Sequence, residues 1–521
     1  MGDHRHTTAP AALAAAGLPA VLAGALAGLA LPPLGSPLLL WPALAVLWEL
    51  AEDPPSAASA PALRRWAGLL WGLAAVLVSH RWLLWLHPLD WVGVPAPLSL
   101  PICLLLWLAC GLLGGLLVQL WLLLARRADA SQAASAVALA CLWGLGEVLL
   151  ARGPLFWIGL GSSALPSDLP LAGLAALGGA GLVAAVQLLL GWCLWRLLRQ
   201  PAAFRRWLPL GLLLLLAGHG FGAAALAGQQ APEAAQAQER LLVLQPAIPT
   251  REKFEVAQQH RLLRQLDAAQ QRAAALLEAP QGPPAIPGLS ALVLPEGALA
   301  LDQPLPGPAP VEVLSGGFRR QGPELRSSLL RFPPGSRVPL GWVDKHRVVP
   351  LGEWLPLASL WRWSGLSAVG GIEPGPPSRL LARPAGAIGV AICYELADGT
   401  ALARASREGA RWLLASANLD PYPRQLQEQF LALARLRAIE SGRWLVAAAN
   451  TGPSLAVDPA GRVHQRLPAG EAAEAVIQLR QRTALTPYSR WGEWPLLLLA
   501  ALAAGWRLSR ITSRRPPGRP R

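Results

Sequence analysis

The segment Gly389-Val-Ala-Ile-Cys-Tyr-Glu395 decides how this chain folds and works, because a short apolar run ends there in a cysteine. Cys393 is the single cysteine of the polar segment 229–490, whereas the other four lie in long apolar runs, namely Cys103, Cys110, Cys141 and Cys193. It therefore cannot form a disulfide within that segment. A partner chain, an inert buried position and a chemical role are the three explanations open to it.

The composition places the chain among membrane proteins. Of its 521 residues, 53% are hydrophobic and only 15% are charged, which is typical of a bundle of membrane helices with one water-exposed domain. The formal net charge of +14 would suit a nucleic-acid-binding protein. Much of it, however, lies in arginine clusters beside apolar runs and in the tail 507–521. This distribution indicates membrane topology, and we expect no nucleic-acid partner.

The apolar runs predict about eight transmembrane helices. A spanning helix needs about 20 apolar residues, and runs near this length occur at 10–32, 34–50, 67–87, 98–125, 132–151, 170–195, 207–228 and 494–506. The predicted domains are a seven-helix transmembrane region over 1–228, a polar domain over 229–490, and a last helix with a basic tail over 491–521. The protein should therefore be a multi-pass integral membrane protein.

The arginine distribution predicts the orientation. If the N-terminus is cytoplasmic, the pairs at 64–65 and 126–127, the cluster within 196–206 and the C-terminal tail all fall on one side. The alternate connections contain one arginine, Arg152. Because positive charge accumulates on the cytoplasmic side, the polar domain should lie on the periplasmic face of a bacterial cytoplasmic (inner) membrane.

Glu147 is the clearest ionisable residue within the predicted spans, near the outer end of the fifth one. An ionisable group in a membrane helix suggests a functional site. The alternative is a carboxylate that reaches interfacial water.

The polar domain alternates between strand and helix patterns. Buried strands are predicted at 241–245, 291–294, 387–392, 412–415 and 444–448, and amphipathic helices at 254–278, 397–409 and 424–441. This succession favours an α/β or α+β domain of the size of an enzyme.

Glu296, Lys345 and Cys393 form the candidate catalytic set. Glu296 and Cys393 each follow a predicted strand, and Lys345 is one of only two lysines among 45 lysines and arginines. A thiol nucleophile needs a base, which a carboxylate can provide. A nearby ammonium lowers the pKa of a thiol and stabilises an oxyanion. Taken alone, each residue would be a weak signal.

With their neighbours, these residues resemble the nitrilase superfamily, and most closely its membrane family, the apolipoprotein N-acyltransferases. In the polar domain the resemblance rests on Lys345 with Pro350-Leu-Gly-Glu353, on Ile392-Cys-Tyr-Glu395, and on Arg437-Ala-Ile-Glu-Ser-Gly-Arg443 with Asn450-Thr-Gly452. In the membrane region it rests on Leu31-Pro-Pro-Leu-Gly35 and Gly153-Pro-Leu-Phe-Trp157. It covers essentially the whole chain and implies a nitrilase-like αββα sandwich next to the membrane helices.

The resemblance also implies a role for each residue. Cys393 would be the nucleophile, Glu296 the general base, and Lys345 the group that stabilises the tetrahedral oxyanion. Supporting roles would fall to the backbone N–H of Tyr394 at the oxyanion, and to Glu353 and Glu395 in orienting Lys345 and the substrate amine. For the two glutamates, a structural salt bridge is the alternative.

The implied reaction transfers a fatty acyl chain in two steps. Cys393 would take the chain from a membrane phospholipid as a thioester. The α-amine of the S-diacylglyceryl cysteine that begins an apolipoprotein would then accept it as an amide. No cofactor and no metal are expected, because the eight histidines show no ligand spacing.

Two rival functions stay open at this stage. A membrane-tethered amide or nitrile hydrolase would use the same three residues with water as the acceptor. A non-enzymatic transporter or scaffold is less favoured, because the spans are almost free of polar residues and the candidate set is complete.

Two loops bear on substrate choice. The apolar segment 353–363 contains Trp354, Trp361 and Trp363, and we interpret it as an interfacial loop that gates lipid entry, with a place in the domain core as the alternative. The segment Ser416-Ala-Asn-Leu-Asp-Pro-Tyr-Pro423 lacks the aromatic pair that the family usually has there. The preferred substrate is therefore left open.

Overall fold

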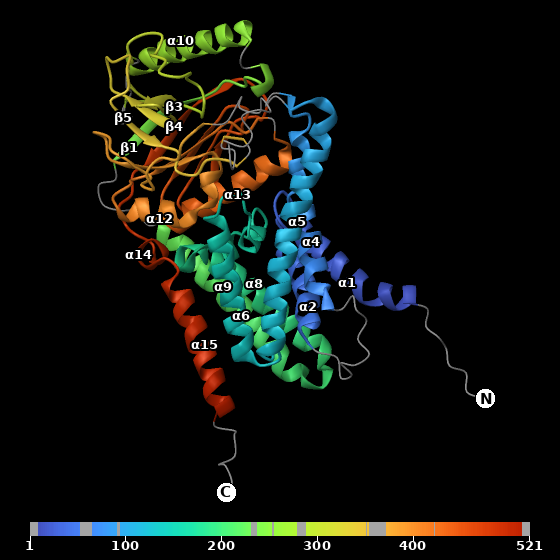
Figure 1. Cartoon of the computed structure of the whole chain (residues 1–521). Helices are drawn as coiled ribbons and strands as arrows, with labels where there is room; N and C mark the ends of the chain where they lie inside the picture. Colours follow the sequence, from blue (N-terminus) through green and yellow to red (C-terminus); the bar gives the residue numbers. More distant parts are fainter. Residues whose placement is uncertain are drawn as a thin grey trace, which may run out of the picture.

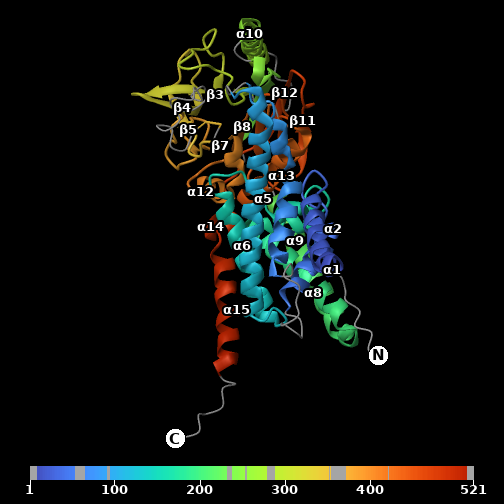
Figure 2. The ribbon, with the colours of Figure 1, turned by 45° about the vertical axis from the view of Figure 1, so that its right-hand side comes forward.

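The computed structural model has two parts, a bundle of apolar helices and an α/β domain at one end of it (Figure 1). It describes residues 9–52, 65–90, 94–230, 237–252, 255–278, 288–350, 352–353, 371–420 and 422–512. The last helix, α15 (Trp494–Thr512), returns along the bundle and packs against α6 (Ala133–Ala151). A view turned by 45° shows the same division, with the long helix α5 (Ala96–Arg127) reaching from the bundle toward the α/β domain (Figure 2).

The bundle helices follow the predicted apolar runs. Besides α5 and α6 they are α1 (Ala9–Leu29), α2 (Pro37–Ala51), α4 (Ala67–Ser79), α7 (Leu169–Ala172), α8 (Ala175–Arg199) and α9 (Phe204–Gln230). In the described part of the chain, four segments are long and apolar enough to cross a membrane: Ala96–Arg127, Ala133–Ala151, Ala175–Arg199 and Pro201–Gln230. The apolar segments Gly17–Leu29, Pro37–Ala51 and Ala67–Ser79 are shorter. The predicted total of about eight spans therefore stays a prediction.

Two predicted spans are not continuous helices. The run 67–87 divides into α4 and the 3-10 helix η2 (Arg81–Leu86). The run 170–195 divides into α7 and α8, and α8 is interrupted at Gly178 and Gly179. Gly179 has a φ of 71°, and a Cβ there would lie 2.6 Å from the ring of Tyr488. Only glycine combines this backbone conformation with such a close neighbour.

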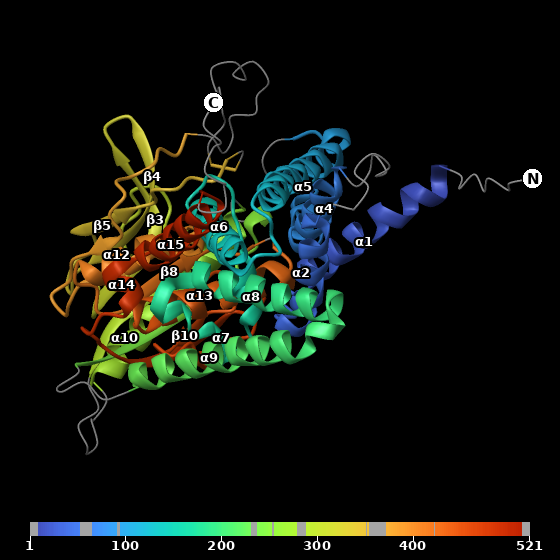
Figure 3. The same cartoon turned by 90° about the horizontal axis from the view of Figure 1, so that it is seen from below.

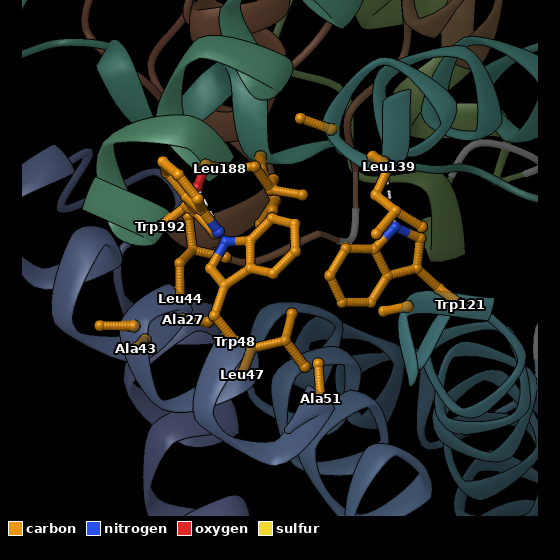
Figure 4. Packing of buried hydrophobic residues seen from close by; sticks show 14 of the residues in the cluster. Ala27, Ala43, Leu44, Leu47, Trp48, Ala51, Trp121, Leu139, Leu188 and Trp192 are labelled. Carbon is orange, nitrogen blue, oxygen red and sulfur yellow. Dashed lines mark hydrogen bonds between the residues drawn. The ribbon is translucent and has the colours of Figure 1, made fainter. Parts of the chain in front are cut away.

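Tryptophans fill the centre of the bundle (Figure 4). Trp48 of α2 donates its indole N–H to the carbonyl oxygen of Leu188 at 2.9 Å, and Trp121 of α5 donates to that of Leu139 at 3.0 Å. The two indole rings meet edge to face with their centroids 5.0 Å apart. A buried indole N–H needs an acceptor, so these bonds fix α2 against α8 and α5 against α6.

The α/β domain contains two six-stranded sheets, ordered β12-β1-β2-β3-β4-β5 and β11-β10-β9-β8-β7-β6. The first comprises β1 (Gln238–Gln245), β2 (Leu289–Leu294), β3 (Glu312–Gln321), β4 (Glu324–Phe332), β5 (Gly341–Asp344) and β12 (Ala473–Arg480). The second comprises β6 (Leu380–Leu381), β7 (Ile388–Ile392), β8 (Leu413–Ala417), β9 (Leu445–Ala449), β10 (Leu455–Val457) and β11 (Val463–Arg466). In each sheet three neighbouring strands pair in parallel, β1–β3 and β7–β9.

The sheets pack face to face between two helical layers. Their inner faces share an apolar core that includes Val243, Val293, Leu414 and Val446. Helix α10 (Val256–Glu278) packs on the outer face of the first sheet, and α12 (Gly399–Arg407) and α13 (Arg424–Ser441) pack on that of the second. This is the αββα order that the family resemblance implies. The view from below places α12 and α13 over the bundle (Figure 3), and α13 contacts α8 directly.

Candidate active site

Glu296, Lys345 and Cys393 come together where three strands end. Glu296 follows β2, Lys345 follows β5, and Cys393 follows β7. The Lys345 Nζ atom lies 2.9 Å from Glu296 Oε1, and the Cys393 thiol is within electrostatic range of both side chains. Since β2 and β5 belong to one sheet and β7 to the other, the face-to-face packing of the sheets assembles the set.

Lys345 is a buried ammonium held between two carboxylates. Its side chain is 1% exposed, and Nζ lies 2.9 Å from Glu296 Oε1 and 2.6 Å from Glu353 Oε1. Burial alone would lower the pKa of Lys345, but the charges of Glu296 and Glu353 outweigh it and hold this pKa well above its ordinary value. The side chain therefore stays positively charged and cannot act as a nucleophile or a base.

Cys393 occupies a sharp turn between β7 and the 3-10 helix η8 (Cys393–Ala397). Its φ is 55°, a conformation that non-glycine residues rarely adopt and that is frequent at functional sites. Burial raises the pKa of the Cys393 thiol above its usual range, and Glu296 and Glu353 raise it further. Lys345 and the backbone N–H of Tyr394 oppose this rise. The resting thiol is thus protonated, and a nucleophilic role would require a base.

Glu296 is the residue that the sequence predicts as that base. Its Oε1 accepts a hydrogen bond from Lys345, and its Oε2 accepts one from the backbone N–H of Asn418 at 3.1 Å. Strand β3 passes very close behind it, because a Cβ on Gly316 would lie 2.4 Å from the Glu296 Cα. Because residue 316 is a glycine, the backbone of Glu296 can pack closely against β3.

The two supporting glutamates have different surroundings. Glu353 binds Lys345, and its second oxygen accepts the Val349 N–H at 2.8 Å. Glu395 instead forms a buried salt bridge with Arg379 at 2.9 Å. It also accepts the backbone N–H groups of His346, Arg347 and Ile392. For Glu395, the sequence left open a supporting role at the site or a structural salt bridge, and the structure shows a salt bridge there.

Tyr394 contacts the neighbouring loop through its hydroxyl and its ring. Its hydroxyl donates to the carbonyl oxygen of Val348 at 2.9 Å. Its ring centroid lies 5.9 Å from Lys345 Nζ and 4.7 Å from the guanidinium carbon of Arg347. Burial raises the pKa of Tyr394 to about 12, so the hydroxyl stays neutral and works as a structural donor.

An asparagine pair supports Glu296, formed by Asn450 of a motif quoted above and by Asn418, to which the sequence analysis gave no role. Asn450 Nδ2 donates to Asn418 Oδ1 at 2.7 Å, and Asn418 Nδ2 donates to Thr250 Oγ1 at 2.8 Å. Asn418 lies just past β8, in the segment noted only for its departure from the family pattern. Asn418 follows a predicted strand, as Glu296 and Cys393 do, and this position could have marked it as a candidate site residue.

Aromatic rings from both parts of the molecule meet beside the set. Trp82 of η2 lies 5.7 Å from Tyr422 and 5.8 Å from Phe156, and Phe156 stacks on Phe430 of α13 at 5.5 Å between centroids. Tyr422 is within electrostatic range of Cys393, and burial raises its pKa above the usual range. The segment 416–423 thus brings an aromatic ring to the site without the expected pair.

An apolar cavity of about 310 Å³ lies within the bundle between α1, α4, α5 and α6. His80 and Trp157 are among its lining residues, and the His80 ring is 6.1 Å from Trp82, so the cavity borders the aromatic cluster. Glu147 lines it too, and its Oε1 accepts the indole N–H of Trp143 and the backbone N–H of Leu160, each at 2.8 Å. These donors hold the Glu147 carboxylate inside the bundle.

Other sequence predictions have a more limited outcome. Trp354, Trp361 and Trp363 lie outside the described residues, so the lipid-gating loop stays a prediction. Among the residues that are described, no three His, Cys, Asp or Glu side chains gather in a way that could hold a metal ion.

Comparison with known proteins decides the family. Residues 23–193 match the model of the apolipoprotein N-acyltransferase N-terminal domain, and residues 315–488 match that of carbon-nitrogen hydrolase. An apolipoprotein N-acyltransferase of Parasynechococcus marenigrum (strain WH8102) is 48% identical over 478 residues, covering 91% of this chain and 96% of that protein. The chain belongs to the apolipoprotein N-acyltransferase family. The resemblance drawn from the sequence motifs is thereby confirmed.

The likeness extends to relatives from other organisms. The apolipoprotein N-acyltransferase of Prochlorococcus marinus (strain MIT 9313) is 47% identical, covering 94% of this chain and 95% of that protein. That of Azotobacter vinelandii is 32% identical, with 96% of each chain covered. Among solved structures, Saccharomyces cerevisiae Nit3, a member of the nitrilase superfamily, matches 48% of this chain with a TM-score of 0.35 and 15% identity. That last likeness adds nothing to the assignment.

Proposed function

We propose that this chain is an apolipoprotein N-acyltransferase with Glu296, Lys345 and Cys393 as its catalytic residues. The observation that carries the proposal is the buried Lys345 ammonium, bound by two carboxylates beside the one cysteine of the α/β domain. A fixed positive charge in a water-poor site is suited to stabilising an oxyanion. Family membership supplies acyl transfer as the class of reaction.

The first step forms a thioester. Glu296 takes the proton of the Cys393 thiol as the sulfur attacks an ester carbonyl of a membrane phospholipid. The tetrahedral oxyanion is stabilised by Lys345 and by the backbone N–H of Tyr394. The C–O bond of the ester then breaks, Glu296 returns the proton to the departing oxygen, and a lysophospholipid leaves.

The second step forms an amide. The α-amine of the diacylglyceryl cysteine of an apolipoprotein attacks the thioester carbonyl, with the same two groups stabilising the oxyanion. Glu296 takes a proton from the nitrogen, the C–S bond breaks, and the sulfur recovers a proton. The enzyme returns to its starting state without a cofactor.

The bundle favours a lipid as the acyl donor. The apolar cavity between α1, α4, α5 and α6 borders the rings around Trp82, and Tyr422 of the same cluster is within electrostatic range of Cys393. A hydrocarbon chain is the ligand that such a lining favours. A soluble amidase has no need of this arrangement.

The membrane placement follows from the same proposal. We place about eight spans across a bacterial inner membrane, seven in 1–228 and one in 491–521, with the catalytic domain 229–490 on the periplasmic side. The basic clusters at 126–127 and 196–206 and in the C-terminal tail support this orientation. Trp491 and Trp494, which are 56% and 74% exposed, suit an interfacial position at the start of the last span.

Intact-protein mass spectrometry tests the catalytic step. The full chain is incubated with phospholipid vesicles of one acyl composition, beside Cys393→Ala and the matched control Cys141→Ala, which alters a bundle cysteine. We expect a hydroxylamine-sensitive acyl adduct on the parent and on Cys141→Ala, and none on Cys393→Ala. A diacylglyceryl-cysteine peptide should discharge the adduct and gain the acyl chain.

The acceptor separates this function from its rival. An adduct that water alone discharges, releasing free fatty acid and leaving the peptide unmodified, would establish the membrane-tethered hydrolase instead. The absence of any adduct on the parent would refute both.

A further inference from the structure

Arg347 connects the catalytic loop to the membrane bundle. It lies two residues after Lys345, but its side chain leaves the α/β domain. Its guanidinium donates to the carbonyl oxygen of Ala151 at 2.6 Å and also to that of Gly153. Ala151 is the last residue of α6. The final carbonyls of a helix lack partners within the helix and lie at the negative end of its dipole, so they suit a cation.

The same residue contacts the nucleophile loop. The guanidinium carbon of Arg347 lies 4.7 Å from the ring centroid of Tyr394, the residue after Cys393. The backbone N–H of Arg347 donates to Glu395 at 3.1 Å. Arg347 is therefore in contact with the end of α6, with the loop that carries Lys345 and with the turn that carries Cys393.

Helix α6 gives this contact a functional meaning. Gly146, Glu147, Leu149 and Leu150, all within the last two turns of α6, line the apolar cavity of the bundle. Arg347 thus binds the end of the helix whose preceding turns form the cavity wall. Any shift of α6 relative to the α/β domain would change the position of the thiol relative to that cavity.

We infer that Arg347 is a positioning residue that holds the catalytic thiol in register with a membrane-embedded acyl donor. The inference rests on the proposed function, since it presupposes that the donor chain approaches from the bundle. Arg347 does not touch the reacting atoms. Its effect should therefore depend on where the donor resides, being large for a donor in a bilayer and small for a donor dissolved in water.

The test compares two donors on the full-length protein. One is a phospholipid in vesicles, and the other is p-nitrophenyl butyrate in solution. Acylation of Cys393 is followed by intact mass, in the parent, in Arg347→Gln and in Arg347→Lys. A misplacement of about 1 Å can cost about 100-fold in rate, so we expect Arg347→Gln to lose at least about tenfold with vesicles and less than about twofold with the soluble ester. Arg347→Lys keeps a cation at the helix end and should recover part of the loss.

Arg251 offers a matched control. It also donates from the α/β domain to a carbonyl of the membrane region, that of Pro88 at 3.2 Å, and among the described residues this side-chain hydrogen bond does not involve the loops of Lys345 and Cys393. Arg251→Gln should leave the ratio of the two rates unchanged. An equal shift of that ratio in Arg251→Gln would overturn the inference, because general docking would then explain the effect.

The remaining outcomes are also decisive. If Arg347→Gln slows both donors equally, Arg347 merely supports the catalytic set, and if it slows neither, the contact has no role. Either result refutes the positioning role while the parent still acylates Cys393. If the parent takes an acyl chain from neither donor, it is the proposed function that fails.

Discussion

Replacing Lys345 with methionine removes the ammonium shared by two carboxylates while keeping a chain of similar length. The Nζ atom lies 2.9 Å from Glu296 and 2.6 Å from Glu353, and the lysine is 1% exposed. At an effective dielectric constant of about 20, each pair corresponds to about 6 kcal/mol of gross Coulomb attraction, most of which offsets the cost of desolvation. Without the ammonium, two neighbouring carboxylates face each other and one of them should take up a proton.

Three consequences for the rate of acylation follow. Loss of a group that stabilises the oxyanion typically costs about 10²- to 10³-fold. A proton on Glu296 would remove the base as well. The pKa of Cys393 should rise further, because Lys345 is one of the groups that lower it. We therefore expect Lys345→Met to acylate at least about 10³-fold more slowly than the parent at neutral pH.

The assay is the single-turnover rate of the Cys393 acyl adduct, measured by intact mass with vesicles. Arg319→Met is the control, since Arg319 binds Asp344, the neighbour of Lys345, at 2.6 Å without contacting the catalytic set. It should keep a rate within about threefold of the parent. Lys345→Arg should not recover activity, because the guanidinium fork does not fit a buried site shaped for an ammonium. A loss below about tenfold in Lys345→Met would refute the oxyanion role.

Further predictions concern the backbone at Glu296, the ring of Tyr422, and the pKa values of Cys393 and Glu440. Gly316→Val should displace Glu296, because its Cβ would lie 2.4 Å from the Glu296 Cα; the acylation rate should fall more than tenfold while circular dichroism keeps its strand signal. Tyr422→Ala opens space beside Trp82 and should change the relative rates with short and long acyl donors, which competition between two vesicle lipids measures. Because burial raises the pKa of Cys393, alkylation of this residue by iodoacetamide should still be accelerating above pH 9, without a plateau at the usual thiol pKa. Burial also raises the pKa of Glu440 from 4.5 to about 7, so the folded chain holds this proton more tightly than the unfolded chain. The stabilisation, about 3 kcal/mol, should be present below pH 4.5 and lost as the pH rises to about 7. The Tm of the parent should therefore fall over this window. If the Tm of Glu440→Gln falls as steeply with pH, Glu440 is not the group responsible.

The sequence predicted the parallel strands β1, β2, β7, β8 and β9 better than the rest of the domain. Each of these strands contains a mostly buried apolar run, such as Leu241-Leu-Val-Leu244 in β1, a pattern that a single sequence displays clearly. Strands β3 and β4 were not predicted. Gly316 and Gly317 interrupt the apolar pattern of β3, and arginines occur within both strands. Their pairing along the whole hairpin, from Val313 with Phe332 to Gln321 with Glu324, depends on tertiary contacts that local pattern does not report.

Two members of the candidate set, Cys393 and Lys345, stand out in the sequence because their residue types are rare in the polar segment, whereas the partners of the set are of common types. A lone cysteine and one of two lysines attract attention in a sequence with 45 lysines and arginines. Arg379, which binds Glu395, is one of many arginines, and nothing local distinguishes it. The same holds for Arg347, whose importance comes from the end of α6, 196 positions away in the chain. Long-range partners of common residue types are visible only in three dimensions.

The two parts of the chain contact each other beside the candidate catalytic set. Trp82 and Phe156 come from the membrane region, Tyr422 and Phe430 come from the α/β domain, and their rings form one cluster. The Arg347 side chain adds a polar connection between the catalytic loop and α6. Because water is disfavoured among these rings, a chain passing from the bundle cavity toward Cys393 would stay in apolar surroundings. The same shielding would protect a thioester at Cys393 from hydrolysis until an amine arrives, which is the property that an acyltransferase needs and a hydrolase does not.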